Sequence, residues 1–158
     1  MSKTFIMGDY FINLFFVTIQ AIVLFLIGLY WFSVSISISP IFFICIFLSA
    51  STFILIGMAI GYIVKSESLS MLLTIFLVML FIIFSDLLAP SVLATPVLNF
   101  FINMNPFVIL QKLLTDIIII NRSIYGLVPN LLKLGIFMLV SFIVVYIAKK
   151  ISKENIMQ

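Results

Sequence analysis

The chain has 158 residues, of which 65% are hydrophobic and 8% are charged, and its net charge is +3. Its mean hydropathy of +1.45 leaves too little polar surface to cover a water-soluble globule, so lipid must be the solvent for much of the chain. The absence of histidine removes the commonest metal ligand and general base, and the single cysteine, Cys45, excludes an internal disulfide.

Four segments are long and apolar enough to cross a bilayer. A spanning helix needs about 20 apolar residues, because the hydrocarbon core is about 30 Å thick and a helix rises about 1.5 Å per residue. The predicted spans are residues 11–32, 41–64, 69–89 and 128–148. The first two carry no charge, the third carries only Asp86, and the fourth carries only Lys133, whose long side chain can reach the nearer interface.

The stretch between the third and fourth predicted spans, residues 90–127, is broken by Pro90, Pro96 and Pro106. Asn105 followed by Pro106 is typical of a helix cap and a first helical position, so a helix is predicted to begin there. This helix has an amphipathic pattern and is shorter than a span requires. Its apolar face would hold Phe107, Leu110, Leu113, Leu114, Ile117 and Ile118, and its polar face Gln111, Lys112, Thr115 and Asp116. We therefore predict a helical hairpin that enters the outer leaflet or lies on it; the alternative is a fifth, partly polar span.

The basic residues predict the orientation of the chain. Five lysines lie before the first span, between the second and third, or after the fourth: Lys3, Lys65, Lys149, Lys150 and Lys153. Of the three others, Lys112 and Arg122 lie within the proline-broken stretch and Lys133 lies near the start of the last span. Under the positive-inside rule both termini are cytoplasmic, whereas a fifth span would place the C-terminal lysines outside. Residues 1–158 are thus predicted to form a single all-α integral membrane domain of the cell (plasma) membrane, with four transmembrane helices and an extracellular re-entrant or interfacial hairpin between the third and fourth.

Nothing in the sequence predicts catalysis. The five acidic residues lie in five separate places, no serine has a recognisable base, and no phosphate-binding loop occurs. We therefore expect no catalytic residue, no cofactor, no bound metal and no nucleic-acid partner. If nucleotide drives this protein, another chain must supply the ATPase.

Two features could have a functional role within the spans. Gly57 and Gly61 form a GxxxG motif, which allows a second helix to approach closely; plain packing within the chain is the favoured interpretation, and a contact that slides or separates during transport is the other. Asp86 and Lys133 are predicted at a similar depth near the outer interface. They could pair with each other, or each could be hydrated separately at the headgroups, and the sequence does not favour either interpretation.

The order of these features resembles the C-terminal half of an ABC-2 type permease, the membrane subunit of ATP-driven exporters. The resemblance rests on residues 63–68 (IVKSES) after a span with small residues, on 84–90 (FSDLLAP) at the end of the next span, on Thr95-Pro96, on Asn105-Pro106-Phe107, and on a final span with a basic tail. It implies that the predicted spans are the third to sixth helices of a six-helix unit. It also implies that residues 90–127 cap the exit side, where Asp86, Pro90, Pro96, Asn105 and Pro106 would shape an outer gate.

Two departures from the family pattern affect what the resemblance implies. Asp86 stands where the family generally has glycine, and the family's first two helices and coupling helix have no counterpart in this chain. The chain could be half of a split permease, a truncated reading frame, or a protein that uses the scaffold for another purpose. The expected partners are an ATP-binding cassette subunit, a second permease chain or the missing N-terminal half, and membrane lipid.

The expected function is therefore that of the permease component of an ABC-2 type exporter, with energy from a separate ATPase. The alternative is a small self-assembling membrane protein, such as a channel with Asp86 lining a pore or an assembly factor, or a non-functional permease fragment. A membrane enzyme is disfavoured by the lack of a polar triad. The apolar helices suit lipids, drugs and peptides equally as substrates.

Overall fold

The fold is described by a computed structural model that covers residues 3–31, 40–64, 66–85, 95–120 and 123–154. Throughout these ranges the regular structure is helical. The helices are α1 (Lys3–Trp31), α2 (Pro40–Ile63), α3 (Glu67–Ile83), α4 (Pro96–Met104), α5 (Pro106–Ile118) and α6 (Ile124–Glu154). The prediction of an all-α protein is confirmed.

Three of these helices are long and apolar enough to cross a membrane by themselves: α1 over Met7–Trp31, α2 over its whole length, and α6 over Ile124–Ser152. A fourth span results if the bent pair α4 and α5 is taken as one crossing. The chain is therefore a multi-pass membrane protein with three or four spans in the part that the structure describes. Long apolar helices are stable in lipid because every backbone group inside them is hydrogen-bonded within the helix.

The predicted third span, residues 69–89, is wrong at its C-terminal end. Helix α3 has 17 residues and ends at Ile83, and residues 86–89 lie outside the described part of the chain. At about 1.5 Å per residue such a helix is about 25 Å long, which is shorter than the hydrocarbon core. Helix α6 extends beyond the predicted fourth span, 128–148, at both ends: it begins at Ile124 and continues through Lys149 and Lys150 to Glu154.

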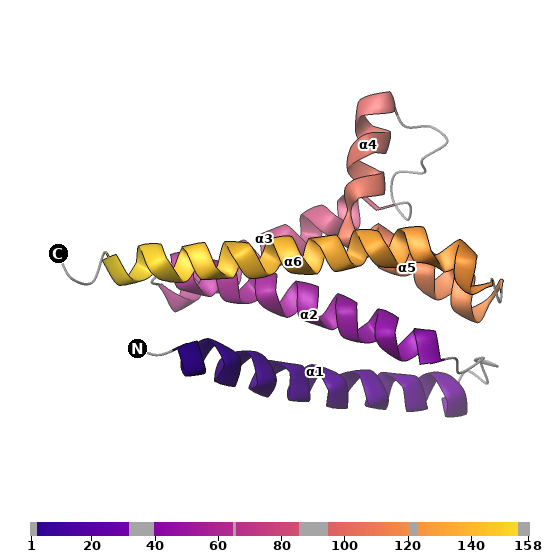
Figure 1. Ribbon diagram of the computed structural model, residues 1–158, viewed down its shortest axis with the longest axis horizontal. Coiled ribbons are helices and arrows are strands. Elements are labelled where there is room, and N and C mark those ends of the chain that lie inside the picture. Colours follow the sequence, from indigo (N-terminus) through magenta and orange to yellow (C-terminus); the bar gives the residue numbers. More distant parts are fainter. Residues whose placement is uncertain (1–2, 32–39, 65, 86–94, 121–122, 155–158) are drawn as a thin grey trace.

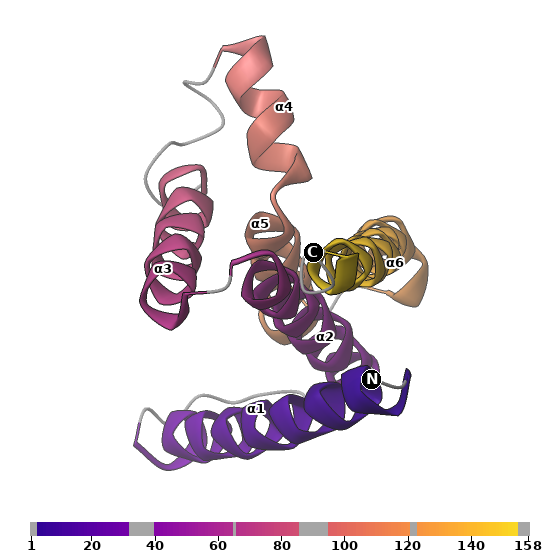
Figure 2. The same cartoon turned by 90° about the vertical axis from the view of Figure 1, so that its left-hand side faces the viewer.

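Helices α1, α2, α3 and α6 run along the long axis of the molecule, and α4 projects away from it (Figure 1). We call the end of the bundle where α1 begins and α6 finishes the terminal end; α2 also finishes and α3 begins there (Figure 1). At the opposite end α1 finishes, α2 and α6 begin, and α5 finishes (Figure 1). Viewed along the axis, α2, α5 and α6 occupy the centre, while α1 and α3 lie on two sides of them (Figure 2).

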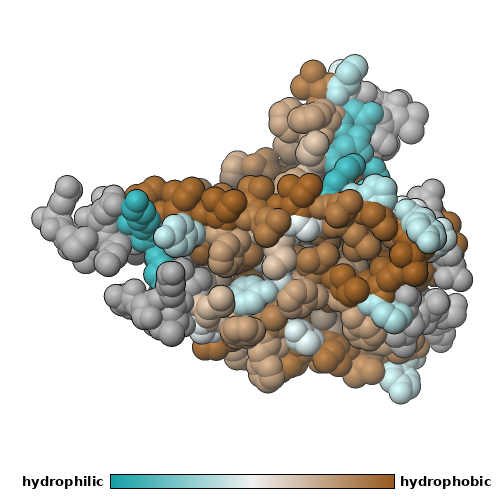
Figure 3. Space-filling model, viewed as in Figure 1, coloured by the Kyte–Doolittle hydropathy of each residue, from teal (hydrophilic) through white to brown (hydrophobic). Residues whose placement is uncertain are grey.

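The core lies between α2 and α6, with α5 packed against both near the opposite end. Its largest cluster contains Cys45 from α2, Ile109, Leu113 and Ile117 from α5, and Leu127 and Leu134 from α6. A second cluster, nearer the terminal end, contains Leu55, Ala59 and Val145. By contrast, α3 has no buried residue, and none of the described side chains of α1 is buried. Both helices therefore present most of their surface to lipid or to another chain, and the exterior in Figure 3 is hydrophobic along most of the bundle.

Candidate functional site at a helix break

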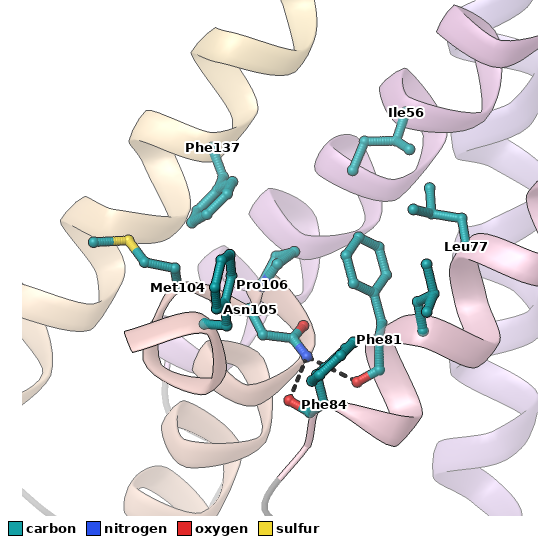
Figure 4. Close-up of a pocket in the computed structure, with 10 residues that line it drawn as sticks. Ile56, Leu77, Phe81, Phe84, Met104, Asn105, Pro106 and Phe137 are labelled. Carbon is teal, nitrogen blue, oxygen red and sulfur yellow. Dashed lines mark hydrogen bonds between the residues drawn. The ribbon is translucent and has the colours of Figure 1, made fainter. Parts of the chain in front are cut away.

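The candidate site is the break between α4 and α5, where both helices meet the last turn of α3 (Figure 4). The two helices are bent by 71° at this point, and Asn105 is the residue between them. A helix end leaves backbone N–H and C=O groups without partners, and lipid cannot supply them. The break is therefore stable only where side chains of the protein satisfy those groups.

Asn105 satisfies groups on two helices at once. Its side-chain oxygen accepts a hydrogen bond of 3.0 Å from the backbone N–H of Phe107 and so caps the start of α5. Its side-chain nitrogen donates to the carbonyl oxygens of Phe81 at 2.8 Å and Phe84 at 2.9 Å, at the end of α3 (Figure 4). The side chain is 5% exposed, so these bonds are made out of contact with water. The predicted cap at Asn105 is confirmed, and the link to α3 is a feature that the sequence did not indicate.

The remaining groups at the end of α3 are also paired. The N–H of Phe84 donates to the carbonyl of Leu80, and the N–H and hydroxyl of Ser85 both donate to the carbonyl of Ile82. Ser85 is fully buried. Four carbonyls at the end of α3, those of Leu80, Phe81, Ile82 and Phe84, thus accept hydrogen bonds in an apolar environment.

Helix α4 begins with its own cap. Thr95 accepts a bond of 3.4 Å from the N–H of Leu98, and Pro96 occupies the first turn, where its missing N–H costs nothing. The polar side of α4 carries Asn99 and Asn103, and Asn103 accepts a bond of 3.2 Å from the ammonium of Lys112 on α5. In Figure 3 hydrophilic residues follow one side of the projecting α4. The helix is therefore amphipathic, and Lys112 lies on the same side as its polar residues.

A cavity of about 320 Å³ lies beside Asn105. It is bordered by five helices, and its lining is almost entirely apolar. The lining residues are Ile56 from α2, Leu77, Leu80, Phe81 and Phe84 from α3 and its end, Phe101 and Met104 from α4, Asn105 and Pro106 at the break, and Phe137 from α6 (Figure 4). A space of this size is within the range of small-molecule sites in proteins.

The side of α5 that is buried in the bundle differs in part from its predicted apolar face. Val108, Ile109 and Leu113 are buried against α2 and α6, and Asp116, predicted on the polar face, is only 7% exposed. The prediction assumed a boundary between lipid and water along one side of the helix. Packing between two long helices decides the buried face instead, and that face includes Asp116.

The other residues predicted for an outer gate are only partly described. Asp86 and Pro90 lie outside the described residues, so the structure gives no distance for the predicted pair of Asp86 and Lys133. Lys133 is exposed on α6. Pro106 begins a helix, as its position after Asn105 predicted, and Pro96 also begins a helix, which was not predicted. The break at Asn105 therefore brings together α3, α4 and α5, and the role of this region as a gate remains a prediction.

The GxxxG motif of α2 has no close neighbour in the described part of the chain. A Cβ atom added at Gly57 or at Gly61 would meet no heavy atom within 4 Å. The favoured interpretation of the motif, close packing within the chain, is thus not what the structure shows. Its glycine face is open, and a groove that includes Gly61, Glu67 and Thr74 lies between α2 and α3.

Polar contacts that the sequence did not indicate hold α1 against α2 near the terminal end. The hydroxyls of Tyr10 and Ser51 are 2.7 Å apart, and the hydroxyl of Tyr62 donates to the carboxylate of Asp9 at 3.3 Å. The ammonium of Lys149 on α6 lies 5.7 Å from the centre of the Tyr62 ring, which places it within range of a cation–π interaction. Pairing of side chains across helices cannot be read from one sequence.

The described side chains include no group of three or more histidine, cysteine, aspartate or glutamate residues that could hold a metal ion. The site at the break consists of apolar side chains, which can hold an apolar group, and one amide, which fixes the break through its hydrogen bonds. Neither property by itself is catalytic. Comparison with protein-family models, with curated proteins and with solved structures finds no match to this chain.

Proposed function

We propose that this chain is a membrane-spanning subunit of an ABC-2 type exporter, which moves a substrate across the membrane with energy from a separate ATPase. The observation that carries the proposal is the helix break at Asn105 within an apolar bundle. Broken helices at membrane depth occur where protein covers the freed backbone groups or where a pathway runs, and they are typical of transporters. The order of sequence motifs that resembles an ABC-2 permease places this break in the hairpin of the exit side.

The small number of helices that contribute buried side chains supports the need for a second membrane chain. Buried side chains come mainly from α2, α5 and α6, whereas α3 has none and the described side chains of α1 have none. The open glycine face at Gly57 and Gly61 adds a surface that a helix could approach closely. A substrate path enclosed by protein would therefore need helices from another chain.

Purification under native conditions tests this function. The tagged full chain would be isolated from its own membranes in mild detergent, and the eluate would be assayed for ATP hydrolysis and analysed by mass spectrometry. We expect an ATP-binding subunit in a fixed ratio to the chain, and ATP hydrolysis that changes when Asn105 is replaced by serine but not when the exposed Asn103 is. A chain that elutes alone and conducts ions in planar bilayers without ATP would support the self-assembling channel instead.

A further inference from the structure

We infer that the cavity beside Asn105 is a binding site for one acyl chain of a membrane lipid. The site requires only that the chain lies in a bilayer, so it does not depend on the proposed transport function. The first argument is depth. Ile56 and Phe137 line the cavity from the interiors of α2 and α6, away from the ends of either helix, so the cavity lies at the level of the hydrocarbon core.

The second argument is the chemistry of the lining. No charged residue contributes to it, and the only polar side chain is that of Asn105. The amide of Asn105 already donates to two carbonyls and accepts from one N–H, so it has little capacity left to bind a polar ligand. A polar or charged molecule would lose its hydration without gaining hydrogen bonds, whereas a hydrocarbon chain has no hydrogen bonds to lose on entering.

The third argument is access. Phe84 at the end of α3 is 39% exposed and Phe101 on α4 is 59% exposed, and both line the cavity. The opening therefore lies between α3 and α4, and the exposed side chains that line it there, those of Phe84, Phe101 and Met104, are apolar. What faces such an opening in a bilayer is the hydrocarbon of neighbouring lipids. Four phenyl rings, those of Phe81, Phe84, Phe101 and Phe137, would contact the chain once it is inside.

A photoreactive lipid tests the site. The full chain would be reconstituted in phosphatidylcholine vesicles with a small fraction of phosphatidylcholine that carries a diazirine in the middle of one acyl chain. After illumination, labelled peptides would be mapped by mass spectrometry. We expect label to concentrate on residues 77–84, 101–106 and 137, and to fall when unlabelled lipid is added in excess. Label spread evenly over the lipid-facing surfaces of α1, α3 and α6 would overturn the inference.

A pair of variants provides the matched control. Leu80→Trp places an indole in the cavity, and Leu72→Trp makes the same change at an exposed position of the same helix. We expect the cavity peptides of Leu80→Trp to lose their label, and those of Leu72→Trp to keep it. Equal labelling of both folded variants would contradict the site. If Leu80→Trp does not fold, the amount of label on the wild-type cavity peptides relative to the lipid-facing peptides of α1 decides, because a non-specific lipid contact labels both alike.

Discussion

At the scale of single residues, Asn105 combines two roles that are usually separate. Its oxygen caps α5, and its nitrogen holds the end of α3. Aspartate and serine are both good helix caps, but neither can donate two hydrogen bonds to carbonyls from this position. Substitutions at Asn105 can therefore separate the cap from the link between helices.

We expect Asn105→Ser to lower the free energy of unfolding by about 1–3 kcal/mol, because two hydrogen bonds of about 0.5–1.5 kcal/mol each are lost. Asn105→Ala should cost about 1 kcal/mol more, since the cap is lost as well. Asn105→Asp should be less stable than the serine variant, because its carboxylate would face the carbonyls of Phe81 and Phe84. Unfolding by sodium dodecyl sulfate in mixed micelles would measure these differences.

Asn103→Ser is the control for this series, because Asn103 is exposed and does not contact α3 in any bond that the structure describes. We expect it to stay within about 0.5 kcal/mol of wild type, as is usual for surface substitutions. If Asn105→Asp is as stable as wild type, the link between α3 and α5 contributes nothing to the fold.

At the scale of helices, α4 differs from the others in projecting away from the bundle (Figure 1). Its polar side carries Asn99 and Asn103, and its exposed apolar residues include Phe100 and Phe101. A lysine bonded to the polar side would be costly in hydrocarbon. An amphipathic helix of this kind is suited to the membrane interface, with its asparagines toward water.

Cysteine labelling tests the position of α4. In a Cys45→Ala background, cysteines at Asn99 and Asn103 should react with an impermeant maleimide added to intact cells, because we predict that this side faces the exterior. Cysteines at Phe100 and Phe101 should react slowly from either side, since they would lie among acyl chains. If the cysteines at positions 99 and 103 react only after the cells have been permeabilised, the predicted orientation is wrong.

How much of each helix was predictable depends on what ends it. For α2 the predicted limits, 41–64, differ from Pro40–Ile63 by one residue at each end, because the apolar run and the helix end together. For α3 the predicted span reaches residue 89, whereas the helix ends at Ile83, where the hydroxyl of Ser85 and the amide of Asn105 pair with the final carbonyls. The second of these partners is 24 residues away from Phe81, so hydropathy along the chain could not reveal it.

The candidate site was predictable only in part for the same reason. The Asn105-Pro106 pair has a local signature, since capping acts over two or three residues. The cavity beside it requires five helices to converge, and no periodicity in one segment encodes that convergence. The burial of Asp116 was not predicted, because the sequence of α5 does not show which side of the helix packs against α2 and α6.

At the scale of the whole molecule, the surfaces of α1 and α3 and the glycine face of α2 are free to pack against other chains. Helix α1 is held to α2 by two side-chain hydrogen bonds near the terminal end and by the contact of Phe25 with Phe42 near the opposite end. Small residues allow close helix contacts in membranes, where packing and not the hydrophobic effect drives association. The glycines of α2 should therefore affect assembly more than they affect the fold of the isolated chain.

Alanine at Gly57 or Gly61 should leave the isolated chain as stable as wild type or up to about 1 kcal/mol more stable, because a Cβ meets no described atom within 4 Å and alanine favours helix. Leucine at both positions should still allow the chain to fold, as shown by thermal unfolding in detergent. It should nevertheless reduce the amount of partner chain that elutes with it, because the larger side chains keep the neighbouring helix away.

Leucine at Gly28 of α1, which is equally open, is the matched control and should not change the yield of partner. If the isolated double leucine variant does not fold, the motif packs inside the chain. If the variant folds and the yield of partner chain is unchanged, the glycine face of α2 lies against lipid.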